Sequence, residues 1–381
     1  MNRCKICIYP DTRPDAHFVD GVCSACRAFA LRTDMSWEFR LDCLKAQIRY
    51  ANERKAPYDV VVGVSGGKDS TWQVLKMLEL GAKVLAVNGI TDMQTPLGRR
   101  NLDNLKRHCD VIEVTPNIEV RKKLVRIGLF RVGDMSWPEH NIIWSAPTRM
   151  AALMGIPLVV WGEQPQREYA NPEGIEPATE LNSAWVHQFG GMGGLRLDDL
   201  VGEEGLTAED LNIFRFPSSD LMERGKVRGI WLSNYIDWDG WKNGFIAQHY
   251  GFEMSPVPVE TSLGNWENLD NYVTILRDFL RFLKFGYTRG TDIACNHIRR
   301  GRLTREEGLV LEAKTFGFPW TSLGKPIEEV LAYFDITLEQ YVDECRRWMN
   351  PEIFSGFGSK FNPVFRKANG SGDAHHTGPA Q

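Results

Sequence analysis

Residues 59–70 read Asp59-Val-Val-Val-Gly-Val64 and then Ser65-Gly-Gly-Lys-Asp-Ser70. The first run is short and β-branched, which is typical of a strand buried on both faces of a sheet. The second run is a glycine-rich turn, and the pattern that follows it, from Ser70 to Leu80, is helical. Together they predict a strand, a tight turn and a helix in immediate succession.

The same alternation continues along the chain. Further strands are predicted at residues 83–87, 111–114, 158–161 and 229–235, and helices at residues 37–53, 97–108, 118–130 and 141–154. Strands that alternate with helices predict an α/β fold in which helices flank a parallel sheet. Such sheets bind ligands beyond the carboxyl ends of their strands, where the loop at Ser65 and the loop after Trp161 are both expected.

The turn at residues 65–70 has the chemistry of a phosphate site. Glycines let the backbone approach an anion closely, and a helix start offers unpaired N–H groups and the positive end of its dipole. Ser65 and Ser70 add hydroxyl donors. Lys68 adds positive charge, and Asp69 is placed to hold Mg2+ against phosphate oxygens. The turn is not a Walker A loop, because Lys68 stands where that pattern needs its second glycine.

Four of the eight cysteines form two Cys-x-x-Cys pairs at the N-terminus: Cys4, Cys7, Cys23 and Cys26. This spacing is typical of a four-thiolate zinc site, with iron in a rubredoxin-like site as the alternative. Closed sites of this kind are usually structural, so a role in docking or stability is expected. The remaining cysteines, Cys43, Cys109, Cys295 and Cys345, are scattered and are expected to be packing residues.

The composition is that of a folded chain with more than one structural unit, with 381 residues of which 43% are hydrophobic and 25% charged. A net charge of -4 gives no overall positive field, so no nucleic-acid partner is expected. No stretch approaches the roughly 20 apolar residues of a membrane helix, and residues 1–11 lack the apolar core of a secretory signal. We therefore expect a cytoplasmic protein without membrane insertion.

Five segments are predicted. They are a zinc-binding knuckle at 1–30, a linker helix at 31–56, a nucleotide-binding domain at 57–265 with a lid or substrate insert, a helical C-terminal region at 266–362, and a disordered tail at 363–381. The C-terminal helices are expected at 267–284, 304–313, 326–333 and 337–349. Within the insert, Trp231, Trp238 and Trp241 belong either to a lid or to a core between sheet and helices.

The pattern Ser-Gly-Gly-x-Asp-Ser resembles the signature of the ATP pyrophosphatase, or PP-loop, family, whose fold is adenine nucleotide α-hydrolase-like. The resemblance implies cleavage of ATP between the α- and β-phosphates. It implies catalytic roles for Lys68, Asp69 and Glu163. The implied ATP-binding residues are Ser65, Gly66, Gly67, Lys68, Asp69, Ser70, Val87, Asn88 and Gly162.

Three features together resemble the N-acetyl sugar amidotransferases of bacterial surface polysaccharide biosynthesis. They are Cys-x-x-Cys-x-x-Pro-Asp-Thr-Arg-Pro from Cys4 to Pro14, the loop at Ser65, and Trp161-Gly-Glu163. The resemblance extends from Gly290 to Glu307. It implies a role in lipopolysaccharide or O-antigen synthesis. It also implies that the acetamido oxygen of a nucleotide-activated N-acetyl sugar is adenylylated, and that ammonia then replaces this oxygen to give an acetamidino sugar.

Two further expectations concern binding partners. Arg299, Arg300, Arg302 and Arg305 form a basic cluster that either binds the diphosphate of the sugar nucleotide or is a solvated loop. The four scattered cysteines lack the setting of a glutaminase nucleophile, so ammonia must come from elsewhere. The family resemblance implies a partner glutaminase similar to the glutamine amidotransferase subunits of histidine biosynthesis.

Two other functions remain open from the sequence. tRNA thiolation also combines zinc knuckles with this ATP loop, but it predicts a basic face and a paired set of catalytic cysteines. An ATP-binding scaffold that holds a glutaminase is the non-enzymatic alternative. Both enzymes would release pyrophosphate from ATP, whereas a non-catalytic scaffold would not.

Overall fold

The computed structural model describes residues 1–366, so most of the predicted tail, residues 367–381, lies outside the described residues. The centre is a five-stranded sheet with the order β5-β4-β3-β6-β7, in which all neighbours are parallel. Its strands are β3 (Val60–Gly63), β4 (Val84–Gly89), β5 (Asp110–Val114), β6 (Leu158–Trp161) and β7 (Arg228–Trp231). The predicted α/β class with a parallel sheet is confirmed. The last strand ends at Trp231, because the chain turns there into the 3-10 helix η5 (Leu232–Asn234).

Both faces of the sheet are covered by helices. Val60 and Val62 of β3 point to one face and Val61 points to the other, as the two-residue period of a strand requires. The first face packs against α2 (Trp37–Glu53), α3 (Lys68–Glu79) and α4 (Pro96–Leu105). The second face packs against α5 (Ile118–Val132), α6 (Trp137–Met154) and parts of the insert. The run of valines is therefore buried on both sides.

The strand order places a crevice between β3 and β6. The chain enters the sheet at β3, steps outward through β4 and β5, and then returns to the other side of β3 at β6. The connections after β3 and β6 therefore leave in opposite directions, and ligands bind α/β sheets at such a point. α3 follows β3, and α7 (Pro165–Glu168) follows β6.

The insert contains more helix than the sequence predicts. It holds α8 (Ser183–Phe189), η2 (Leu197–Leu200), η3 (Glu203–Gly205), α9 (Ala208–Leu211), η4 (Asn212–Phe214), α10 (Ser219–Gly225) and α11 (Gly240–His249). α11 begins where Asp239 Oδ1 accepts a hydrogen bond from Trp241 N–H at 3.2 Å. Trp231 and Trp238 are buried in the core, whereas Trp241 is 37% exposed.

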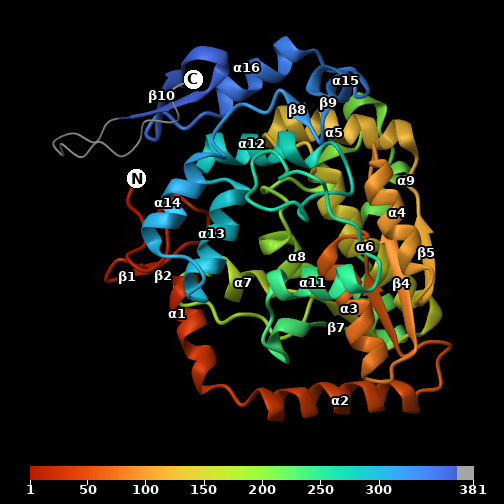
Figure 1. Ribbon diagram of the computed structural model, residues 1–381. Helices are drawn as coiled ribbons and strands as arrows, with labels where there is room; N and C mark the ends of the chain where they lie inside the picture. Colours follow the sequence, from red (N-terminus) through yellow and green to blue (C-terminus); the bar gives the residue numbers. More distant parts are fainter. Residues whose placement is uncertain (367–381) are drawn as a thin grey trace.

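The C-terminal region is helical, as predicted, and its last two helices lie at the opposite end of the molecule from α2 (Figure 1). Its helices are α12 (Thr274–Phe285), α13 (Arg289–Arg299), α14 (Arg305–Ala313), α15 (Ile327–Ala332) and α16 (Leu338–Trp348). Two short hairpins complete it, β8 (Thr321–Ser322) with β9 (Lys325–Pro326), and β10 (Phe354–Phe357) with β11 (Pro363–Phe365), the latter joined by η6 (Ser359–Phe361).

Two boundaries and one helix in this region differ from the sequence predictions. α12 starts at Thr274 instead of residue 267, because Asn271 Oδ1 accepts from the N–H groups of Val273 and Thr274 and so ends the preceding turn. The helix α13 was not predicted. The tail predicted from residue 363 begins too early, because β11 pairs with β10 and Phe365 packs on Phe354.

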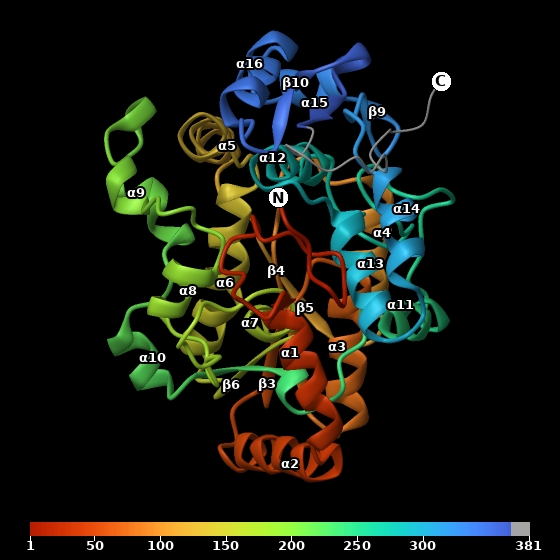
Figure 2. The ribbon, with the colours of Figure 1, turned by 90° about the vertical axis from the view of Figure 1, so that its left-hand side faces the viewer.

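The N-terminal segment forms a small unit of its own. It contains β1 (Phe18–Val19), β2 (Val22–Cys23), α1 (Ser24–Ala30) and η1 (Leu31–Asp34). Its buried residues pack with Ala294 and Cys295 of α13 and with Leu309 of α14, and Figure 2 shows this red segment near both helices. Among residues 1–366, no helix combines the length and apolar character that a membrane crossing requires.

Replacing Phe279 by Ala tests the C-terminal core. Phe279 of α12 is fully buried among α15, α16 and β10, so Phe279→Ala is expected to lower the free energy of unfolding by about 3–5 kcal/mol. Urea unfolding measures the change. Val310→Ala, at a 64% exposed position on α14, is the control and should change it by less than about 0.5 kcal/mol. Equal effects of the two substitutions would contradict this packing.

Candidate active site

The loop at residues 65–70 lies at the carboxyl end of β3 and is folded by its own side chains. Gly67 N–H donates to Ser65 Oγ over 3.2 Å, and Ser70 Oγ donates to the Gly67 carbonyl over 3.1 Å. Gly66 has φ +85°, and a Cβ at this residue would lie 2.8 Å from the backbone N of Leu102. Both the conformation and the space therefore require glycine at residue 66.

The helix α3 begins immediately after this turn. Its N-cap is Gly67, which has no side chain to offer to the first amides of the helix. The N–H groups of the first turn are therefore open to an anion, and the helix dipole adds partial positive charge. This is the arrangement that the sequence predicts for phosphate oxygens.

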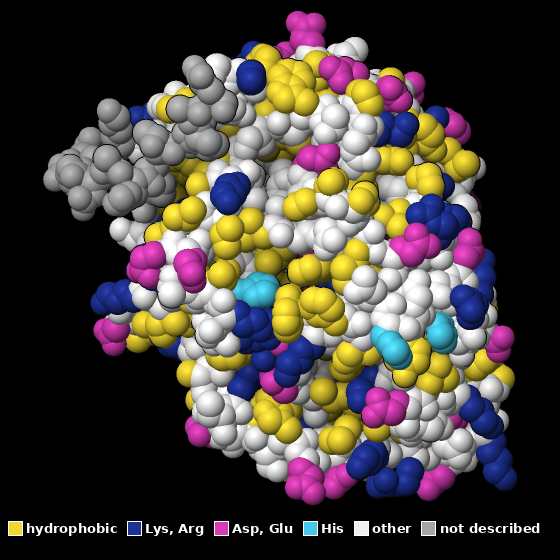
Figure 3. Space-filling model, viewed as in Figure 1, with side chains coloured by type: hydrophobic (Ala, Val, Ile, Leu, Met, Phe, Trp, Pro, Cys, Tyr) yellow, Lys and Arg dark blue, Asp and Glu magenta, His cyan; other side chains and the backbone are white. Residues whose placement is uncertain are grey.

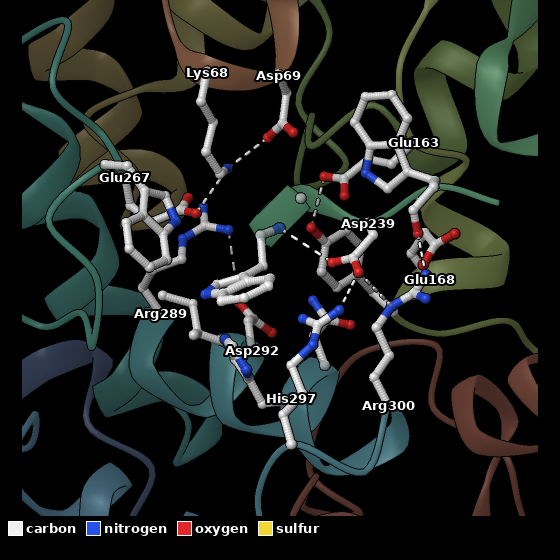
Figure 4. A pocket seen from close by; sticks show the side chains of 18 of the residues that line it. Lys68, Asp69, Glu163, Glu168, Asp239, Glu267, Arg289, Asp292, His297 and Arg300 are labelled. Atoms are coloured by element: carbon white, nitrogen blue, oxygen red, sulfur yellow. Dashed lines mark hydrogen bonds and ion pairs between the residues drawn. The ribbon is translucent and has the colours of Figure 1, made fainter. Parts of the chain in front are cut away.

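Lys68 is buried between two carboxylates. Its Nζ lies 2.6 Å from Asp69 Oδ2 and 2.8 Å from Glu267 Oε1 (Figure 4). Burial by itself lowers the pKa of an ammonium group, but the two carboxylates outweigh burial and raise the pKa of Lys68 above its ordinary value. Asp69 Oδ1 in turn accepts from Asn243 Nδ2 of α11 at 3.1 Å. The charged ends of Lys68 and Asp69 are thus fixed by two other parts of the chain.

Glu163 follows β6 and faces the same pocket. Tyr169 Oη donates to its Oε1 over 2.6 Å. Burial, together with the nearby charge of Asp69, raises the pKa of Glu163 to about 8. Both protonation states of Glu163 are then populated near neutral pH, which suits a group that accepts and returns a proton.

The helix α13 supplies the opposite wall through Asp292. Asp292 Oδ1 accepts from Tyr9 Oη over 2.8 Å and pairs with Arg13 Nη1 at 2.7 Å. Arg281 and Arg289 approach its Oδ2 at 3.3 Å and 3.9 Å. Burial alone would raise the pKa of Asp292, but the guanidinium groups hold it well below its ordinary value. Asp292 therefore connects the N-terminal segment to the pocket wall.

The four arginines predicted to bind substrate are divided between two places. Arg300 and Arg302 line the pocket that contains Lys68 and Asp69. Both are paired with acidic residues just before α11. Arg300 Nη2 lies 3.1 Å from Asp237 Oδ1, and Arg302 pairs with Asp239.

Arg299 and Arg305 face the N-terminal segment and do not line this pocket. Arg305 Nε donates to the carbonyls of Cys4 and Cys7 at 3.2 Å each. Arg299 Nη2 donates to the Glu168 carbonyl at 3.1 Å. The structure therefore brings two of the four predicted arginines to the pocket.

Val87, Asn88 and Gly162 are buried at the strand ends but do not line the Lys68 pocket. Val87 packs in the core. Asn88 Nδ2 donates to the Val64 carbonyl, and Asn88 Oδ1 has no hydrogen-bond partner among residues 1–366. A Cβ at Gly162 would lie 2.5 Å from the Trp238 ring, so the close approach of that ring requires glycine here. Their contact with ATP remains a prediction.

The four N-terminal cysteines come together as predicted. Their sulfur atoms lie within 4.8 Å of one another, and all four residues are buried. Cys4 Sγ is 3.9 Å from Cys26 Sγ, and Cys7 Sγ is 3.7 Å from Cys23 Sγ. Four thiolates bound at about 2.3 Å to a tetrahedral zinc ion stand about 3.8 Å apart, so this set fits a zinc ion.

Several residues of the pocket are not apparent from the sequence. Glu267, Arg289 and Tyr169 line it together with Lys68, Asp69 and Glu163. Glu267 was assigned to a helix, and nothing in its sequence context indicates a partner two hundred residues earlier. The helix that carries Asp292 could have been recognised from Thr288 and Thr291. Each of these side chains accepts a hydrogen bond from the other residue's backbone N–H at the start of α13.

Comparison with known families identifies one region. Residues 265–361 match the model of the C-terminal domain of WbpG-like LPS biosynthesis proteins. No match was found among curated proteins. The matched region carries Glu267, Arg289 and Asp292, and thus a wall of the pocket. The match supports a polysaccharide biosynthesis protein, fits a role in lipopolysaccharide synthesis and suggests an enzyme.

Metal analysis tests the cysteine site. We expect one zinc ion per chain when the protein is purified under reducing conditions, because all four thiolates are buried and preorganised. Cys23→Ser should lose the metal, whereas Cys43→Ser, at a half-buried cysteine outside the group, should retain it. Elemental analysis that finds iron, or an unchanged zinc content in Cys23→Ser, would contradict the assignment.

Proposed function

We propose that this chain is an ATP-dependent amidotransferase that acts on a nucleotide-activated N-acetyl sugar. It transfers AMP to the acetamido oxygen, and ammonia then replaces that oxygen to give an acetamidino sugar, AMP and pyrophosphate. The observation that carries the proposal is the meeting of Lys68, Asp69 and Glu163 in one pocket with residues of the LPS-biosynthesis match.

The chemistry explains why ATP is needed. An amide carbon is a poor electrophile and its oxygen is a poor leaving group. In the first step the amide oxygen attacks the α-phosphorus, and the bond to the β-phosphate oxygen breaks. In the second step ammonia attacks the resulting imidate carbon, the carbon–oxygen bond to AMP breaks, and one proton is lost. The sum is amide plus ammonia plus ATP giving the protonated amidine, AMP, pyrophosphate and one proton.

The loop residues are suited to the departing pyrophosphate. Lys68 and the open amides of the first turn of α3 would stabilise its negative charge as the bond breaks. Asp69 is the proposed Mg2+ ligand, and Mg2+ there would neutralise phosphate oxygens. Gly66 and Gly67 keep the backbone free of side chains at the point of approach.

Glu163 is the proposed proton acceptor in the second step. Ammonia gains positive charge as it attacks, and a carboxylate with a pKa of about 8 can take the proton that is released. Tyr169 orients the carboxylate through its 2.6 Å hydrogen bond. In this proposal Tyr169 is a positioning residue.

Ammonia would come from a partner glutaminase similar to the glutamine amidotransferase subunits of histidine biosynthesis. tRNA thiolation is disfavoured, because among the residues lining the Lys68 pocket there is no cysteine. Cys295 is buried beside Cys7, and Cys109 lies in the core cluster on the α3 face of the sheet.

Product analysis tests the proposed reaction. The full chain is incubated with ATP, Mg2+, an ammonium salt and a set of acetamido sugar nucleotides. Mass spectrometry should find a product in which one oxygen is replaced by NH. A product formed without ATP, or none with any acetamido sugar, would overturn the proposal.

Asp69→Asn is expected to lower turnover by on the order of 10²–10³-fold, because it removes the carboxylate that is proposed to hold Mg2+ against the phosphates. The fold should be retained, since Asn243 and Glu267 still hold the neighbouring groups. Asp103→Asn, at an exposed acidic residue of α4, is the matched control and should keep normal turnover. Turnover in Asp69→Asn that equals the control value would count against the site.

The pH dependence of turnover tests Glu163. A proton acceptor must be ionised, so kcat should rise as the pH increases through about 8 and level off above it. Free ammonia is held constant across the series. Tyr169→Phe should shift the rise to higher pH, because the lost hydrogen bond stabilised the carboxylate. Glu163→Gln should abolish the rise, and an unchanged profile in that variant would exclude Glu163 as the acceptor.

A further inference from the structure

Aromatic rings gather at the mouth of the Lys68 pocket. The Trp241 ring lies 4.8 Å from that of Phe245 and 6.2 Å from that of His297, and Phe245 lies 6.4 Å from Trp266. They come from α11, the segment after it, and α13. Figure 3 shows hydrophobic side chains beside a hollow on this face, next to Lys or Arg and a histidine.

Trp241 and Phe245 are more exposed than the other tryptophans of the insert. Trp231 and Trp238 are buried in the core, whereas Trp241 is 37% and Phe245 is 48% exposed. Aromatic side chains that line a pocket together with a few convergent polar groups are a frequent feature of ligand sites. Trp241 itself lines the pocket.

The position of Trp241 restricts what it can contact. It follows Gly240, where a Cβ would lie 3.6 Å from Asp69 Oδ1 and 3.8 Å from Lys68 Nζ. Adjacent Cα atoms are about 3.8 Å apart, so Trp241 lies close to the groups proposed to act on ATP. A ligand that contacts this ring lies near Lys68 and Asp69, where the acetamido group is proposed to react. In a sugar nucleotide a ribose and a diphosphate separate the base from the sugar that carries the acetamido group, so the sugar is the better fit to this ring.

We propose that Trp241 is the platform on which the pyranose ring of the sugar substrate stacks. This inference rests on the proposed function and assigns a sugar subsite within it. One face of a pyranose presents polarised C–H groups, which the negative face of an indole attracts. The guanidinium group of Arg302, which pairs with Asp239, lies over one face of the Trp241 ring at 4.6 Å from the ring centroid, so the sugar would stack on the other face. Stacking would fix the acetamido group toward Lys68 and Asp69.

Saturation-transfer NMR with UDP-N-acetylglucosamine as the probe, in the absence of ATP, tests the platform on the full chain. The pyranose C–H protons should receive the strongest saturation. Trp241→Ala should weaken binding by about tenfold, which corresponds to about 1.4 kcal/mol, and Trp241→Phe should restore part of the affinity. Trp320→Ala is the matched control, because Trp320 is similarly exposed, at 40%, and lies outside the pocket.

Several outcomes would overturn the platform. They are no binding of the probe to the wild-type chain, saturation confined to the uracil base, or equal affinity of Trp241→Ala and Trp320→Ala. Turnover separates this failure from that of the proposed function. If Trp241→Ala forms amidine with an unchanged KM, the platform fails and the function stands. If the sugar binds through Trp241 but ATP yields no AMP, the function fails and the platform stands.

Discussion

A buried ammonium group must be neutralised by opposite charge. Lys68 pairs with two carboxylates that are far apart from each other in the sequence. Asp69 is its neighbour in sequence, whereas Glu267 comes from the C-terminal region. The Lys68 ammonium group therefore links the glycine loop to the C-terminal region. On the proposed function, a phosphate entering the pocket competes with these carboxylates for Lys68. Nucleotide binding and the position of Glu267 are then coupled through a single side chain.

The opposite wall of the pocket depends in turn on the cysteine-rich segment. Tyr9 and Arg13 of that segment bind Asp292, and Arg305 binds the backbone of its first cysteine pair. The helix α13 thus lies between the metal-binding residues and the pocket. Because the segment has few apolar residues of its own, a bound metal would set the position of Tyr9 and Arg13. A metal bound there would act on the pocket through these contacts, without touching Lys68, Asp69 or Glu163.

The sequence predicts the sheet, the loop and the metal site, because each depends on local pattern. The run of valines at β3 has no polar residue to face water, so it is buried on both faces of the sheet. Thr304 with Glu307, and Thr337 with Gln340, have the spacing of a capping box and mark the starts of α14 and α16. The rest depends on contacts between distant segments. The spacing of the four arginines predicted to bind substrate does not reveal that α13 ends at Arg299. In the structure Arg300 and Arg302 line the pocket, whereas Arg299 and Arg305 do not. Glu267 likewise depends on the folding of the C-terminal region against the sheet.

On the proposed function, the turn from Ser65 to Ser70 holds the two terminal phosphates of ATP so that they leave together. Supplying the chain with ATP labelled at the α-phosphate, an ammonium salt and an acetamido sugar nucleotide, and separating the labelled nucleotides by chromatography, tests this claim most directly. The account predicts labelled AMP together with pyrophosphate. Labelled ADP together with inorganic phosphate would contradict it.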